Sequence, residues 1–206
     1  MHAEWQVECG ADDPVVVVPW SGPDTSFVDL RTHPHAIDEI PEAEAHPPLM
    51  QALRALNAGR SPIFTAKCDA WALSEDEVAQ LRLDLALEVV DAHEEDAAEN
   101  DSAALKSGFG SYIDFICRDR ALFASFARQE HLLRSVTRLA LPLDHHRTAL
   151  DCVLRPAFVS LQGAQEGFAV SLYVKALGES SRKAWSAWAL AMSDVVDVLR
   201  RKEVFR

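Results

Sequence analysis

The strongest constraint on the fold lies in the last sixty residues, where two kinds of apolar spacing follow one another. From Phe168 to Lys175, apolar residues alternate with small or polar ones, which is the period of a half-buried β-strand. The segment Leu150–Leu154 alternates in the same way, and the residues from Gln162 to Gly167 connect the two. The pattern predicts a β-hairpin.

A long helix should follow this hairpin. Ser180 or Ser181 is a suitable N-cap, and the helix is expected to run to about Lys202. Its apolar residues recur at spacings of three and four, at Trp185, Trp188, Met192, Val195 and Leu199. We therefore expect this stripe to pack on the apolar side of the hairpin rather than to form an exposed partner surface.

The first thirty residues favour short strands, at Trp5–Cys9, Val15–Val18 and Ser26–Leu30. The segment Arg31–Pro48 carries four prolines, which are unfavourable inside a regular helix, so it is expected to be an ordered loop. A helix is predicted at Leu49–Leu56.

An extended run from Ser61 to Trp71 precedes a second predicted helix. This helix should begin at Ser74, where Ser74 and Glu77 match a capping box. The acidic stretch from Asp91 to Asp101 has no apolar period and is expected to be a linker or loop. Helix formers and aromatics in Phe109–Leu141 predict two helices that break near residues 118–120.

These elements predict an α+β protein, with short N-terminal strands and helices, a central helical segment, and a C-terminal β-hairpin packed on a long helix. Strands do not alternate regularly with helices, so a doubly wound parallel sheet is not expected. We predict a single α+β domain over residues 1–206. The alternative is an acidic half, residues 1–103, packed against a basic half, residues 104–206.

The charge distribution underlies that alternative. Residues 1–103 hold 5 basic and 22 acidic residues, and residues 104–206 hold 15 and 10, within a chain of net charge −12. Complementary halves can attract each other within one chain or between two copies, so self-association as a homodimer is one expectation. Helical spacing also places Arg128, His131, Arg134 and Arg138 on one basic stripe. The overall negative charge disfavours nucleic acid as a partner.

The chain begins Met1-His2-Ala3-Glu4-Trp5, without the basic start and apolar stretch of a secretory signal, and contains no apolar run of membrane-spanning length. Its four cysteines are widely separated, as is typical of reduced residues in the cytoplasm. We therefore expect an acidic, soluble, cytoplasmic protein that does not associate with a membrane.

No short catalytic signature is present: GxGxxG, GxxxxGK[ST], HExxH and GxSxG are all absent. Whether the protein is an enzyme is left open. The first interpretation is a binding or protein-interaction protein, with another protein or a second copy as partner.

The second interpretation is a small-molecule enzyme or binder. An aromatic ring and charged groups near strand ends can line a ligand cleft. The residues concerned are Trp20, Asp29, Arg31, Lys67, Cys68 and Asp69. Lys67 beside Cys68 could also activate a nucleophilic thiol, although in a strand Cys68 points away from Lys67 and Asp69. The alternative is an Asp29–Arg31 surface pair, a core Trp20 and a buried Cys68.

The third interpretation is a metal site in the loop from His33 to His46. His33, His35 and His46, with Glu39, Glu42 and Glu44 between them, are ligand types suited to zinc or another divalent ion. Their spacing matches no specific template, so a polar surface loop is the alternative. No other cofactor is predicted. The sequence leaves substrate, reaction and oligomeric state undetermined.

Overall fold

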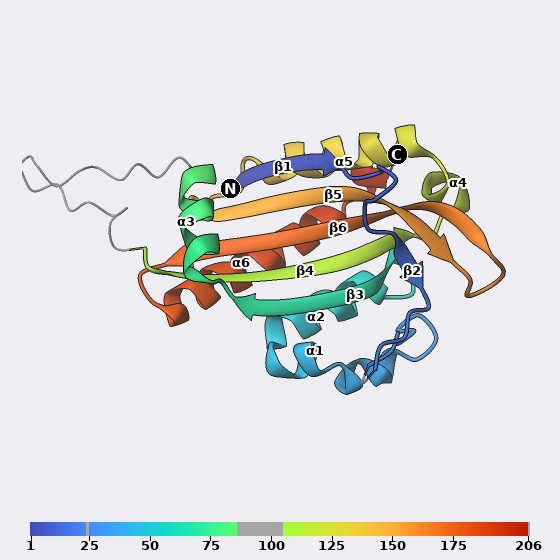
Figure 1. Cartoon of the computed structure of the whole chain (residues 1–206), viewed down its shortest axis with the longest axis horizontal. Coiled ribbons are helices and arrows are strands. Elements are labelled where there is room, and N and C mark those ends of the chain that lie inside the picture. The colour runs from blue at the N-terminus through green and yellow to red at the C-terminus, as the bar shows by residue number, and fades with distance from the viewer. Residues whose placement is uncertain (24, 86–104, 206) are drawn as a thin grey trace, which may run out of the picture.

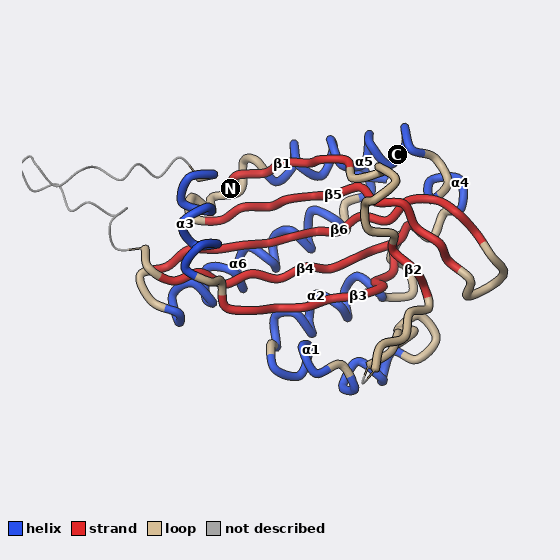
Figure 2. Tube along the Cα trace, in the orientation of Figure 1, coloured by secondary structure: helices blue, strands red, loops and turns tan. Residues whose placement is uncertain are grey.

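The protein is an α+β structure built on one mixed sheet (Figures 1 and 2). The computed structural model describes residues 1–23, 25–85 and 105–205. Strands β1, β5, β6, β4 and β3 lie side by side in that order, and β2 pairs with a later part of β5. Their bounds are His2–Val7 for β1, Val16–Val18 for β2, Ile63–Ala72 for β3, Ser107–Cys117 for β4, Thr148–Val159 for β5 and Gln165–Gly178 for β6. The predicted fold class is thereby confirmed.

The sheet combines both halves of the sequence. The C-terminal strands β5, β6 and β4 are antiparallel neighbours at its centre. The N-terminal strands flank them, β1 parallel to β5 and β3 antiparallel to β4. An ion pair between Arg155 and Glu8 also joins the two halves, with two guanidinium nitrogens of Arg155 donating to one Glu8 carboxylate oxygen at 2.8 and 3.0 Å. Opposite charges therefore meet within a single chain.

Three helices cover one face of the sheet: α2 (Pro47–Asn57), α5 (Phe126–Ala140) and α6 (Ser181–Leu199). Trp188 of α6 is fully buried, and its ring lies 4.8 Å from that of Phe109 on β4. Its indole nitrogen donates a 2.8 Å hydrogen bond to the Ser111 hydroxyl. The predicted packing of the C-terminal helix on the hairpin is confirmed, with Ser180 as its N-cap.

Among the described residues, the other face of the sheet is covered only near its ends. Helix α3 (Glu75–Asp84) packs Val78 and Leu81 against Ala149 and Leu177 at one end. The capping box that begins this helix is present as predicted. At the opposite end, the segment that joins β1 to β2 passes in front of the sheet in Figure 1. Between these covers, polar side chains of the central strands face outward.

The predicted helix at the start of Phe109–Leu141 is wrong, because residues 107–117 form β4. This strand is central and buried on both faces along most of its length, so its sequence lacks the alternation of a half-exposed strand. The remainder is helical as expected, in the short α4 (Arg120–Phe123) and in α5.

Two further expectations near the N-terminus are wrong. Ser26–Leu30 is not a strand: Ser26 makes only an isolated bridge to Ser21. The prolines of Arg31–Pro48 begin helices instead of forbidding them. They occupy the first turns of the 3₁₀ helix η1 (Pro34–Glu39), of α1 (Pro41–Ala45) and of α2, where a missing N–H costs little.

The expected acidic linker, Asp91–Asp101, lies outside the described residues. The chain ends in a second 3₁₀ helix, η2 (Lys202–Phe205). Within the part of the chain that the structure describes, no helix has both the length and the apolar character needed to cross a membrane.

Candidate ligand pocket at the edge of the sheet

A β-bulge in the edge strand β3 organises the candidate site. Thr65 pairs with Phe115 and Lys67 with Asp114, so Ala66 is an extra residue in β3. The extra residue changes which side chains face each side of the sheet. Thr65 therefore faces α2 under the sheet, whereas Lys67 stands on the outer face beside Asp114.

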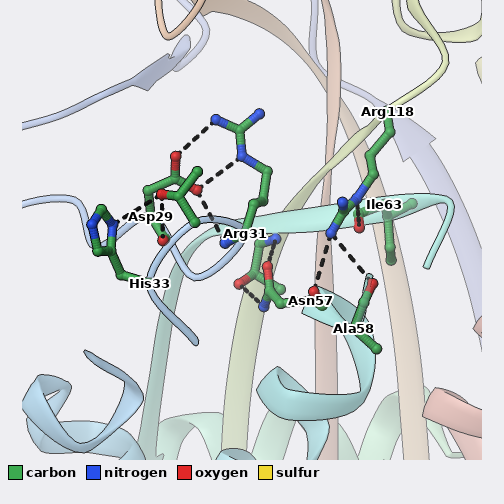
Figure 3. A network of polar contacts seen from close by, with 9 residues as sticks. Asp29, Arg31, His33, Asn57, Ala58, Ile63 and Arg118 are labelled. Carbon is green, nitrogen blue, oxygen red and sulfur yellow. Dashed lines mark hydrogen bonds and ion pairs between the residues drawn. The ribbon is translucent and has the colours of Figure 1, made fainter. Parts of the chain in front are cut away.

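The side chain of Asn57, at the end of α2, holds the strand just before the bulge. Its amide nitrogen donates to the Thr65 hydroxyl at 2.7 Å and to the Leu53 carbonyl at 2.8 Å. Its oxygen accepts from the Thr65 backbone N–H at 3.0 Å. Figure 3 shows Asn57 between these elements, beside the guanidinium of Arg118, which donates to the carbonyls of Ile63, Asn57 and Ala58. The start of β3 is thus fixed to α2 by buried polar contacts.

Trp20 closes the bulge from the outside. Its indole nitrogen donates a 2.8 Å hydrogen bond to the carbonyl of Ala66, the extra residue of the bulge. The Lys67 ammonium lies 5.6 Å from the centre of the Trp20 ring, a distance typical of a cation–π contact. Trp20 and the bulge therefore form one wall together.

A pocket of about 370 Å³ opens beside this wall. Its other residues come from β3 and β4, from the 25–30 segment, from the end of η1 and the start of α1, and from α2. The side chains with polar or ionisable groups that line it are those of Trp20, Thr25, Ser26, Glu39, Glu42, Thr65, Lys67, Cys68, Asp69 and Tyr112. This volume is in the range of small-molecule sites.

The surroundings of the pocket keep the Cys68 thiol and the Tyr112 hydroxyl protonated. Burial raises the pKa of the Cys68 thiol to about 12, and the carboxylates of Glu42, Asp69 and Asp114 add to the effect. Burial, followed by Asp114 and Asp69, also raises the pKa of Tyr112 far above its usual value. At neutral pH Cys68 is a thiol, which is a poor nucleophile. The idea that Lys67 activates Cys68 therefore has no support in this geometry.

The structure brings together four of the six predicted ligand residues: Trp20, Lys67, Cys68 and Asp69 line the pocket. Asp29 and Arg31 do not. They form a bidentate pair with distances of 2.8 and 2.9 Å (Figure 3). Arg31 also lies 4.4 Å over the Phe64 ring and lines a separate hollow. The Arg31 guanidinium lowers the pKa of Asp29.

The three histidines of the predicted metal loop have different surroundings. The Nδ1 of His33 is 2.9 Å from the Thr32 hydroxyl, and His35 is exposed on η1. His46 packs edge-on against Phe109, with ring centres 5.2 Å apart. Among the described residues, no group of three or more His, Cys, Asp or Glu side chains is arranged to hold a metal ion. Zinc or another divalent ion in this loop stays a prediction.

The predicted basic stripe on α5 is exposed at Arg128, His131, Arg134 and Arg138. Two of its arginines form ion pairs with acids of its own half, Arg134 with Glu130 at 2.7 Å and Arg128 with Asp119 at 3.8 Å. Arg134 also lies 5.4 Å from the centre of the Trp5 ring.

A second hollow, of about 270 Å³, lies on the open sheet face between β1, β5 and β6. Arg155 lines it, pairs with Glu8 and donates to the Ser171 hydroxyl at 3.0 Å. That hydroxyl in turn donates to the buried Asp114 at 2.5 Å. The charges here are therefore already paired within the protein.

The sequence does not predict six polar residues of the main pocket as ligand-site residues: Thr25, Ser26, Glu39, Glu42, Thr65 and Tyr112. The sequence pattern places Glu39 and Glu42 in a predicted metal loop, whereas in the structure they line the pocket from η1 and α1. It predicts a helix at Tyr112, whereas β4 directs this residue outward opposite Asp69. No local signal could join these segments, because the pairing of β3 with β4 brings them together.

Comparison with known protein families, curated proteins and solved structures gave no match to this chain.

Proposed function

We propose that the pocket beside the β3 bulge binds a small organic molecule, and that the protein acts as a small-molecule binder. The observation that carries the proposal is that the pocket is lined by charged side chains that have no ion-pair partner among the described residues. Lys67, Glu39, Glu42 and Asp69 all lack one within 4.0 Å. By contrast, Arg155 elsewhere on the sheet face is paired with Glu8.

The surroundings of these charges support a binding role. The bulge and the Asn57 contacts hold β3 in place, so the wall of the pocket is formed before any ligand arrives. Apolar side chains, among them Val28, Ile40 and Leu53, line other parts of the pocket. A mixture of apolar surface and a few fixed polar groups is typical of ligand sites.

A cytoplasmic location is part of the proposal. It is supported by four free cysteines, two of them buried, as expected in a reducing compartment. Self-association and a protein partner stay predictions. The contacts between the acidic and basic halves occur within one chain, so charge complementarity alone does not call for a dimer.

The proposal is tested with a fragment library screened by ligand-observed NMR. Ser26→Trp places an indole at the pocket wall, and Ser186→Trp places one on an exposed position of α6 as the matched control. We expect fragments that bind the unmodified protein to lose binding to Ser26→Trp and to keep it with Ser186→Trp. Fragments that bind both variants equally, or a screen without binders, would contradict the proposal.

A further inference from the structure

The charges that line the pocket are unequal in number. Three carboxylates, Glu39, Glu42 and Asp69, face one ammonium, that of Lys67. Glu42 and Asp69 are half-buried, so solvent screens their charge less than at a fully exposed site. The lining therefore has a net negative charge, which favours a positively charged occupant.

Two neighbouring groups report the same sign of potential. Burial is the main reason that the Cys68 thiol and the Tyr112 hydroxyl keep their protons, and nearby carboxylates act in the same direction: Glu42 and Asp69 on Cys68, Asp114 and Asp69 on Tyr112. These groups lie on different strands, β3 and β4. Carboxylates therefore act on pocket-lining groups of both strands.

The aromatic wall already holds a cation. The Lys67 ammonium lies over the Trp20 ring, and its side chain is exposed and so free to move into solvent. The face of an indole ring attracts ammonium and guanidinium groups. An incoming cation would find the same ring face, with Lys67 as its competitor.

The carboxylates are spread around the pocket rather than gathered at one point. Glu39, Glu42 and Asp69 belong to no cluster able to hold a metal ion among the described residues. Charges spread around a volume of about 370 Å³, with apolar side chains between them, suit an organic cation better than a bare ion.

We infer that the ligand of this pocket is an organic cation, a molecule that joins an ammonium or guanidinium group to an aromatic or apolar body. The inference rests on the proposed function and adds the ligand class. The cationic group would lie near Glu42 and Asp69, and the apolar body would lie along Val28, Ile40 and Leu53.

The test uses three probes that share an indole ring and differ in charge. Tryptamine is a cation at neutral pH, tryptophol is neutral and indole-3-acetate is an anion. Isothermal titration at low salt should give at least about tenfold tighter binding of tryptamine than of tryptophol, and the weakest binding for indole-3-acetate. Equal affinity for tryptamine and tryptophol, or tighter binding of the anion, would overturn the inference.

Variants show whether the selectivity arises in this pocket. Glu42→Gln should weaken the binding of tryptamine about fivefold. Glu44→Gln, the same change on the same helix but outside the pocket, should leave the affinity for tryptamine unchanged. Lys67→Met should strengthen the binding of tryptamine, because it removes a positive charge that repels the ligand. Equal effects of the two glutamate changes would contradict the inference.

The two proposals can fail separately. If none of the three probes binds but uncharged or anionic fragments bind at Ser26, the ligand class is wrong and the pocket remains a binding site. If neither probes nor fragments bind, the proposed function itself is wrong.

Discussion

Replacing Asn57 by alanine should lower the stability of the protein substantially, because its side chain joins α2 to β3 from a buried position. The residue is 8% exposed and makes three hydrogen bonds, with the Leu53 carbonyl, the Thr65 hydroxyl and the Thr65 N–H. Each such bond contributes about 1 kcal/mol net, and a buried N–H left without a partner adds its own cost. The expected loss is about 3 kcal/mol in the free energy of unfolding.

Thermal unfolding followed by circular dichroism measures this loss. In a chain of this length, about 3 kcal/mol corresponds to a decrease of roughly 6–12 °C in Tm. Thr65→Val is the matched control, because it removes one acceptor and leaves the other two bonds of Asn57 in place. It should cost about 1 kcal/mol.

The double variant completes the cycle. Since both changes remove the bond from the Asn57 amide to the Thr65 hydroxyl, their combined effect should be smaller than the sum of the single effects. The reasoning is refuted if Asn57→Ala costs less than about 1 kcal/mol, or if Thr65→Val costs as much.

Three further predictions concern thiol reactivity, a buried carboxyl and close backbone packing. Iodoacetamide at pH 8 should label the exposed Cys9 well before Cys68, whose pKa of about 12 keeps it a thiol; peptide mass spectrometry that found Cys68 labelled as fast would contradict this. Burial raises the pKa of Asp114 above 3.8, so its ionisation costs stability as pH rises through the folded-state pKa. The stability of Asp114→Asn relative to the unmodified protein should therefore increase from pH 3.5 to pH 7 in urea unfolding, and a difference that stays constant or falls would count against a buried carboxylate. Gly178→Ala should lower stability by about 1–3 kcal/mol, because its Cβ would lie 2.3 Å from the backbone nitrogen of Ala184. Gly59→Ala, with no atom within 4 Å of its Cβ, should be tolerated. Equal unfolding midpoints for the two variants would contradict the prediction, because they would show that the contact at Gly178 relaxes.

The C-terminal part of the fold could be predicted because its patterns are local. Strand β6 has one buried and one partly exposed face along much of its length, so its sequence alternates, and α6 buries a single stripe centred on Trp188. Strand β4 could not be predicted in this way. Both of its faces are buried over most of its length, which leaves a run rich in aromatics that also resembles a helix.

The candidate pocket was predicted in part for a similar reason. Trp20, Lys67, Cys68 and Asp69 stood out because each is an unusual residue in its own segment. Whether segments meet depends on strand register, and the bulge at Ala66 decides which side chains of β3 face outward. The carboxylates of η1 and α1 could join the site only once the chain was folded.

A crystal structure of the protein soaked with tryptamine tests the central claim most directly. The account predicts an indole beside Trp20 and an ammonium nitrogen within about 4 Å of a carboxylate oxygen of Glu42, Glu39 or Asp69, a salt-bridge distance. Tryptamine bound elsewhere on the molecule, with the hollow next to β3 left empty, would contradict it.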